Sequence, residues 1–199
     1  MKTLVTICAL VCASSATVAA APSAPTPPSA PSASSAARSA TKAATKPAAV
    51  KPLKLGDALP DVTAPDQDGK PVVLREFGGK GFLLVYFYPK ADTPGCTKQA
   101  CSLRDSYAEL QTRGVKVLGV SLDTPEAQKK FQEKNKLPFS LLADKEKKAV
   151  VTAFGVPVSR DAAGRQAFLF EDGKCVWLDY KAATSKQAAD VLKFLNKKK

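Results

Sequence analysis

An unbroken apolar and aromatic run at residues 82–88 constrains the fold of this chain more than any other segment. Its sequence is Phe-Leu-Leu-Val-Tyr-Phe-Tyr, and Pro89 ends it. A strand with one face in water alternates apolar and polar side chains, whereas this run is apolar on both faces. It therefore predicts a strand in the middle of a sheet that is covered on both sides.

Helical and strand patterns alternate along the chain after this run. Thr-Pro pairs at residues 93–94 and 124–125 join a capping residue to the residue best tolerated in the first helical turn. Glycines follow some of the segments in which apolar residues recur at helical spacing. Together, these start and stop signals predict helices at residues 94–113, 125–135, 145–154 and 185–195. Further strands are expected at residues 115–120, 139–142, 168–170 and 174–178, and a loop at residues 157–163.

The turn dipeptide Asp68-Gly69 separates residues 62–64 from residues 72–74 and predicts a small amino-terminal hairpin. Strands that alternate with helices form α/β layer folds. The order of elements is compatible with a thioredoxin-like fold, in which helices flank a central mixed sheet.

Residues 1–21 have the pattern of a secretory signal peptide. A basic start is followed by an uncharged apolar centre and by small residues that predict cleavage near Ala20 or Ala21. Cys8 and Cys12 lie in this segment and would be lost with it. We expect the protein to be exported to the periplasm without stable membrane insertion; the alternatives are an uncleaved membrane anchor and an organelle transit peptide.

Residues 22–52 consist mainly of Ala, Pro, Ser and Thr and offer almost no large side chain to bury. This composition predicts a disordered tether. Residues 53–199 are enough for one domain with a core of its own.

The chain carries a formal charge of +12, of which residues 1–50 contribute four bases and no acid. The remaining bases are spread along predicted helix faces, apart from a terminal run at residues 197–199. Nucleic-acid binding would need bases clustered with aromatic residues or a recognised motif, and the sequence has neither. We expect no nucleic-acid partner.

The sequence contains no histidine. Nucleophiles activated by histidine and metal centres ligated by histidine are therefore excluded. We expect neither a metal nor an organic cofactor, so any nucleophile must be activated by other means.

Cys96 falls in the first turn of the helix predicted from residue 94. Unpaired backbone N–H groups and the positive end of the helix dipole favour an anion there, and so favour the reactive thiolate. Thr93 precedes this turn, where its hydroxyl could cap the helix or could hydrogen-bond the thiolate and a bound oxygen.

Cys101 lies five residues further along the same predicted helix. Five helical residues advance about 7.5 Å and turn about 140°, which leaves the two Cα atoms roughly 8 to 9 Å apart. A disulfide needs Cα atoms within about 7 Å, so the two thiols cannot pair while the helix is intact. If they pair, a turn must unwind, which is typical of a catalytic disulfide and not of a structural one. The alternative is two unrelated cysteines.

Cys175 lies in the strand predicted at residues 174–178, next to Trp177. A buried and unreactive thiol is the preferred interpretation.

The stretch Tyr-Pro-Lys-Ala-Asp-Thr-Pro-Gly-Cys-Thr-Lys-Gln-Ala-Cys at residues 88–101 resembles the peroxiredoxin Q, or bacterioferritin comigratory protein, branch of the peroxiredoxins. The resemblance extends over residues 53–199 and includes Gly-Arg-Gln-Ala-Phe-Leu at residues 164–169. It implies that Pro89 shields Cys96, that Thr93 holds the peroxide oxygen, and that Arg165 stabilises the thiolate. Arg160, in the neighbouring loop, competes for the arginine role.

The resemblance also implies a reaction. Cys96 would reduce hydrogen peroxide or an organic hydroperoxide and become a sulfenic acid, and Cys101 would condense with it to an intramolecular disulfide. A thioredoxin-like dithiol protein would then reduce the disulfide, and the enzyme would be a monomer.

Two other functions remain open at this point. An extracytoplasmic thiol–disulfide oxidoreductase of thioredoxin type would share the fold, although it normally has two residues between its cysteines and this pair has four. A module that binds a metal or a partner without catalysis is the other, although two cysteines without histidine make a poor metal site.

Overall fold

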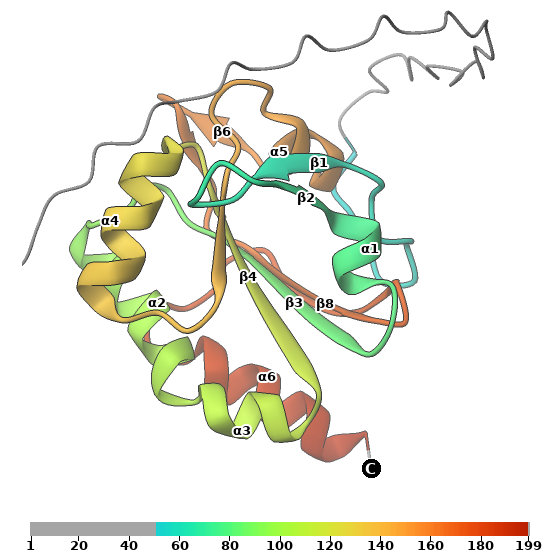
Figure 1. Ribbon diagram of the computed structural model, residues 1–199. Helices are drawn as coiled ribbons and strands as arrows, with labels where there is room; N and C mark the ends of the chain where they lie inside the picture. The colour runs from blue at the N-terminus through green and yellow to red at the C-terminus, as the bar shows by residue number, and fades with distance from the viewer. Residues whose placement is uncertain (1–50, 199) are drawn as a thin grey trace, which may run out of the picture. The chain divides into compact units, whose positions relative to one another are not determined.

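A mixed sheet of five strands forms the centre of the computed structural model, which describes residues 51–198 (Figure 1). The strand order is β5-β4-β3-β8-β9. β3 (Phe82–Phe87) is the middle strand, parallel to β4 and antiparallel to β8. The predicted central, doubly covered strand is thus confirmed. The predicted signal peptide and, apart from Lys51 and Pro52, the predicted tether lie outside the described residues.

The other elements of the sheet and the hairpins have the following bounds: β1 Thr63–Pro65, β2 Pro71–Val73, β4 Val115–Ser121, β5 Ser140–Ala143, β6 Val158–Ser159, β7 Ala162–Ala163, β8 Ala167–Glu171 and β9 Lys174–Asp179. The helices are α1 Leu74–Gly78, α2 Pro94–Asp105, α3 Tyr107–Thr112, α4 Pro125–Asn135, α5 Ala149–Phe154 and α6 Gln187–Lys197. The amino-terminal hairpin is confirmed, because β1 and β2 pair antiparallel around the Asp68-Gly69 turn.

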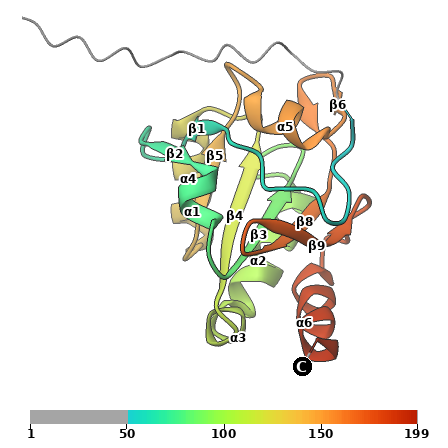
Figure 2. The same cartoon turned by 90° about the vertical axis from the view of Figure 1, so that its right-hand side faces the viewer.

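Helices cover both faces of the sheet, and successive residues of β3 point to opposite sides. Leu84 and Tyr86 join a core with side chains of α2, α3, α4 and α6, whereas Leu83 and Val85 join a second core with side chains of α1, α5 and β1. Figures 1 and 2 show α2, α3 and α6 grouped on one side of the molecule and α5 with the β1–β2 hairpin on the other.

The single helix expected at residues 94–113 is two helices. Ser106 has φ −98° and ψ 7°, which ends α2 and begins α3. Serine is a poor helix-interior residue because its hydroxyl competes for backbone partners. The bend lets Tyr107 pack on Phe139, with ring centroids 5.7 Å apart.

The helix expected at residues 145–154 begins only at Ala149. Lys148 adopts a left-handed conformation with φ 48°, which a helix cannot continue through. The Asp144 carboxylate accepts the N–H groups of Ala149 and Val151 at 2.8 Å each and so caps the shorter helix. Burial raises the pKa of Asp144, and these backbone hydrogen bonds act against that rise.

Two further expectations were wrong. The loop expected at residues 157–163 holds a small hairpin, whose turn residues Arg160 and Asp161 both have positive φ. Asn-Gly is the usual pair for such a turn, so the sequence carried no signal for it. The last helix starts at Gln187 and not at Ser185, and the carbonyl of Ser185 accepts a hydrogen bond from the Ser102 hydroxyl at 3.2 Å.

Gly155 closes α5 where the chain enters the domain. It has φ +65°, and a Cβ added there would lie 2.4 Å from the Lys51 oxygen and 2.6 Å from the Pro52 Cα. We expect Gly155→Ala to lower the free energy of unfolding by about 2–4 kcal/mol, because left-handed strain and a backbone clash add together. Urea denaturation measures the change.

Gly114 provides the matched control for this substitution. It has φ +71°, but a Cβ added there would meet nothing within 4 Å. Gly114→Ala should therefore lower the free energy of unfolding only by the left-handed strain, about 1–2 kcal/mol. Equal losses in the two variants would show that the contact with residues 51 and 52 does not matter.

Candidate active site

Cys96 lies in the first turn of α2, directly after the loop that follows β3. The first helical hydrogen bond runs from the Thr97 N–H to the Thr93 oxygen at 2.8 Å. The N–H groups of Gly95 and Cys96 precede that bond and so have no acceptor within the helix. The Cys96 side chain is 1% exposed and packs in the core that contains Tyr86. Its sulfur therefore sits where a helix start favours a negative charge.

Arg165 brings a permanent positive charge to this sulfur. Its Nη2 atom lies 3.4 Å from the Cys96 Sγ atom, and its Nη1 atom donates to Gln99 Oε1. The backbone oxygen of Arg165 also accepts from the Ala182 N–H at 3.2 Å, which fixes the segment before β8. Arg160, the competing residue, is exposed in the β6–β7 turn. Of the two arginines, only Arg165 contacts the thiol.

Thr93 occupies the N-cap position of α2, but its side chain does not cap the helix. Its hydroxyl donates to the Lys90 carbonyl at 3.0 Å, which closes the loop before the helix. The expected capping role is thus wrong, because the local turn takes the hydroxyl proton. Pro89 is half-buried and lines a hollow of about 460 Å³ with Lys90 and Leu122.

Cys101 lies further along α2 on a side of the helix that faces α4. The residue is half-buried, and its Sγ atom lies 4.0 Å from Asn135 Oδ1. Arg104 Nη1 donates to the Asn135 carbonyl at 2.8 Å and ties the same part of α2 to α4. Cys96 and Cys101 are both free thiols on an intact helix.

The sequence profile of the AhpC/TSA family matches residues 55–177. Peroxiredoxin Bcp of Escherichia coli K12 is 46% identical over 144 residues, which are 67% of this chain and 91% of that protein. Chloroplastic peroxiredoxin Q of Gentiana triflora is 42% identical over 144 residues, 70% of this chain and 65% of that protein. The chain belongs to the AhpC/TSA family and is a peroxiredoxin.

Solved structures agree with this assignment. Peroxidoxin BcpB of Mycobacterium tuberculosis superposes with a TM-score of 0.69 at 31% identity, over 74% of this chain and 99% of that one. The bacterioferritin comigratory protein of Xanthomonas campestris gives 0.65 at 29% identity, over 71% and 99%. The expected thioredoxin-like fold is confirmed. This peroxiredoxin is a thiol-dependent peroxidase, an oxidoreductase, and the alternative of a thiol–disulfide oxidoreductase is not favoured.

Burial alone does not distinguish Cys96, the candidate reactive thiol, from Cys175. The two side chains are 1% and 2% exposed. Cys175 lies in β9, and its sulfur donates to the Trp177 carbonyl at 3.6 Å. Burial, with a smaller effect of Asp57, raises the pKa of Cys175 to about 11.

We expect Cys175 to resist alkylation in the folded, reduced protein. At pH 8 a thiol with a pKa of about 11 is ionised in roughly one molecule in a thousand, and only the thiolate reacts. Iodoacetamide followed by peptide mass analysis should therefore modify Cys175 in urea and spare it under native conditions. Equal labelling in both conditions would contradict the assignment.

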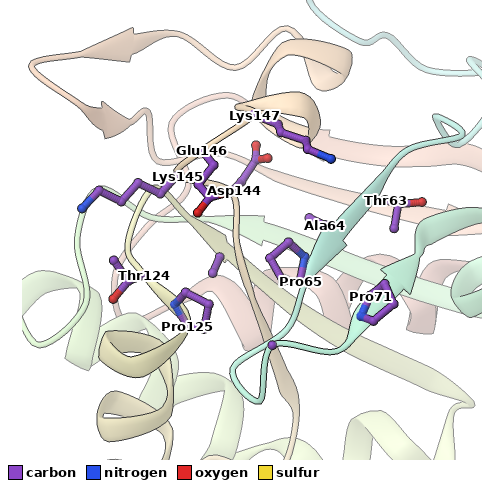
Figure 3. Close-up of a pocket in the computed structure, with 12 residues that line it drawn as sticks. Thr63, Ala64, Pro65, Pro71, Thr124, Pro125, Asp144, Lys145, Glu146 and Lys147 are labelled. Carbon is purple, nitrogen blue, oxygen red and sulfur yellow. The ribbon is translucent and has the colours of Figure 1, made fainter. Parts of the chain in front are cut away.

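The hollow in Figure 3 lies away from this chemistry. It measures about 310 Å³ and is lined by the β1–β2 hairpin, the start of α4 and the segment after β5. No cysteine lines it, and its Asp144 carboxylate already accepts backbone N–H groups.

Within residues 51–198, no three Cys, Asp or Glu side chains converge as a metal site would require. Among the same residues, none of the helices combines the length and hydropathy that crossing a membrane requires.

Two glutamines near Arg165 were missed by the sequence analysis. Gln99 is three residues after Cys96, a spacing that places both on one side of a helix, and this could have indicated it. Gln187 comes from α6, and its contact with Gln99 at 2.6 Å joins residues 88 positions apart. Nothing in the sequence pattern indicates such a contact.

Proposed function

We propose that this peroxiredoxin reduces hydrogen peroxide and organic hydroperoxides through a Cys96 sulfenic acid and a Cys96–Cys101 disulfide. A thioredoxin-like dithiol protein would restore the two thiols. The observation that carries the proposal is the 3.4 Å contact between the Arg165 guanidinium and the Cys96 sulfur at the start of α2. A thiolate there is stabilised by a group that cannot lose its charge.

In the first step, the Cys96 thiolate attacks the terminal oxygen of the hydroperoxide. An S–O bond forms, the O–O bond breaks, and the alkoxide or hydroxide leaves with a proton as alcohol or water. Sulfur loses two electrons and the peroxide gains them. Arg165 and the N–H groups of Gly95 and Cys96, which precede the first helical hydrogen bond, would stabilise the negative charge as it moves. Thr93 and Pro89 would shape the approach of the peroxide.

In the second step, the Cys101 thiol attacks the sulfenic sulfur, an S–S bond forms, and water leaves. Both residues lie on α2, where a separation of five residues keeps the Cα atoms about 8 to 9 Å apart. At least one turn of α2 must therefore unwind before the bond can form. Ser106 already ends α2 one turn beyond Cys101, so the unwound segment can stop there without involving α3.

In the third step, a dithiol protein attacks the disulfide, forms a mixed disulfide and leaves oxidised, with both peroxiredoxin thiols restored.

The proposal includes export with removal of residues 1–21, a periplasmic location and a monomeric enzyme. The signal-like pattern at the start of the chain supports the export part.

Intact mass before and after one equivalent of hydrogen peroxide tests the cycle. The expected product has lost two hydrogens, and peptide mapping places the new bond between Cys96 and Cys101. A stable gain of one oxygen at Cys96 would remove Cys101 from the cycle. An insulin-reduction assay beside a peroxide assay separates this activity from that of a general disulfide reductase.

A further inference from the structure

A chain of polar side chains runs through the otherwise apolar contact between α2 and α6 and ends at the reactive sulfur. Gln187 Oε1 accepts from Gln99 Nε2 at 2.6 Å, and Gln99 Oε1 accepts from Arg165 Nη1. The other arm of the Arg165 guanidinium lies 3.4 Å from Cys96 Sγ. The two glutamine side chains are 1% and 0% exposed.

Stability does not explain why α6 has a glutamine at this position. The side chains that α2 and α6 contribute to this core are apolar, including Ala100, Ala188 and Val191. Within the described part of the chain, Gln187 Nε2 is buried and has no hydrogen-bond partner. A buried donor without a partner costs about 1–3 kcal/mol; an apolar side chain would remove this donor but would leave Gln99 Nε2 without its acceptor, so the two costs offset each other. The carboxamide oxygen is the part of the residue with a partner.

The direction of the hydrogen bonds explains what that oxygen does. A guanidinium has only donors, so Gln99 must present its oxygen to Arg165. The NH₂ group of Gln99 then points away from Arg165 and needs an acceptor in an apolar surrounding. Gln187 Oε1 is that acceptor. With it in place, the Gln99 side chain is held at both ends, and the Arg165 guanidinium is held against Cys96.

We propose that Gln187 is a positioning residue for the peroxidase reaction, acting through Gln99 on the Arg165 guanidinium. It touches neither the peroxide nor the reacting sulfur. The proposal rests on the proposed function, because it assumes that Cys96 is the residue that reduces the peroxide.

Gln187→Leu tests the proposal because it removes the acceptor and the orphaned donor together. The urea midpoint of this variant should stay close to that of the unaltered protein, because it removes one buried donor without a partner, Gln187 Nε2, and leaves another, Gln99 Nε2, without its acceptor. The second-order rate constant for oxidation of Cys96 by hydrogen peroxide, followed by rapid quenching and mass analysis, should fall about tenfold because the guanidinium is no longer fixed. The pH at which that rate reaches half its maximum should rise, since a loosely held cation stabilises a thiolate less.

Ser102→Ala is the matched control, because it removes a hydrogen bond between α2 and the segment that precedes α6, from the Ser102 hydroxyl to the Ser185 carbonyl at 3.2 Å. Its oxidation rate should stay within twofold of the unaltered protein. If Gln187→Leu lowers the urea midpoint or fails to fold, the residue is structural and the proposal is wrong. An unchanged rate or an unchanged pH profile also overturns it.

A double-mutant cycle with Gln99→Glu isolates the orienting effect. A carboxylate has two equivalent acceptor oxygens, so one of them faces Arg165 whichever way the group turns. In that background Gln187→Leu should change the oxidation rate less than twofold. A tenfold loss that persists there contradicts the relay. If the unaltered protein does not oxidise at Cys96, the proposed function has failed; if it does and Gln187→Leu reacts equally fast, only the relay has failed.

Discussion

Cys96→Ser should consume no peroxide above the rate of buffer, a loss of at least about 10⁴-fold. The reaction requires an atom that can form a bond to the peroxide oxygen and carry two more oxidising equivalents afterwards. Sulfur does this as a sulfenic acid, whereas a serine hydroxyl is a weak nucleophile with no comparable oxidised state. Peroxide consumption with a dithiol reductant in excess measures the change.

Cys175→Ala is the control for this substitution. It removes another buried thiol, whose pKa burial raises to about 11. Its peroxide consumption should remain close to that of the unaltered protein. If Cys96→Ser retained its turnover while Cys175→Ala lost it, the reactive thiol would have been assigned to the wrong core of the sheet.

Arg165→Gln should slow the oxidation of Cys96 by about 10²-fold, because it removes a charged donor 3.4 Å from the sulfur. Arg165→Lys should recover part of the rate, since it restores the charge but not the two-armed contact with Cys96 and Gln99. Rapid-quench kinetics with hydrogen peroxide measures each rate constant.

Arg160→Gln removes the same charge from the exposed β6–β7 turn and should change the rate less than twofold. Comparing the two variants shows whether the oxidation rate depends on the contact between Arg165 and Cys96 or on the overall positive charge of the domain. Comparable losses in the two would mean that overall charge, and not the contact with Cys96, governs the thiolate.

Elements whose signals are local could be predicted from the sequence. The apolar run at residues 82–88 gave the middle strand, and the Thr124 side chain caps α4 as expected, accepting from the Ala127 N–H at 3.3 Å. Cys96 lies in the first turn of its helix because that helix begins at Pro94. Each of these inferences depends on residues within one turn or one strand of each other.

Features that depend on tertiary contact could not be predicted. Lys148 and Arg160 adopt left-handed conformations that their residue types do not indicate. Arg165 was selected by resemblance and not by spacing, since one arginine among 30 bases carries no signal of its own. Gln187 was not found at all, because its contact joins α6 to α2 across most of the domain sequence.

The chain enters the domain on the face of the sheet opposite to Cys96. Leu53 packs in the core under α5, and its N–H donates to the Phe154 carbonyl at 3.1 Å, whereas Cys96 and α6 belong to the other core. Immobilisation on an electrode or bead through the amino-terminal side therefore leaves the thiol face open to a protein reductant. A bulky carboxyl-terminal fusion would instead extend from α6, the helix that contacts Gln99.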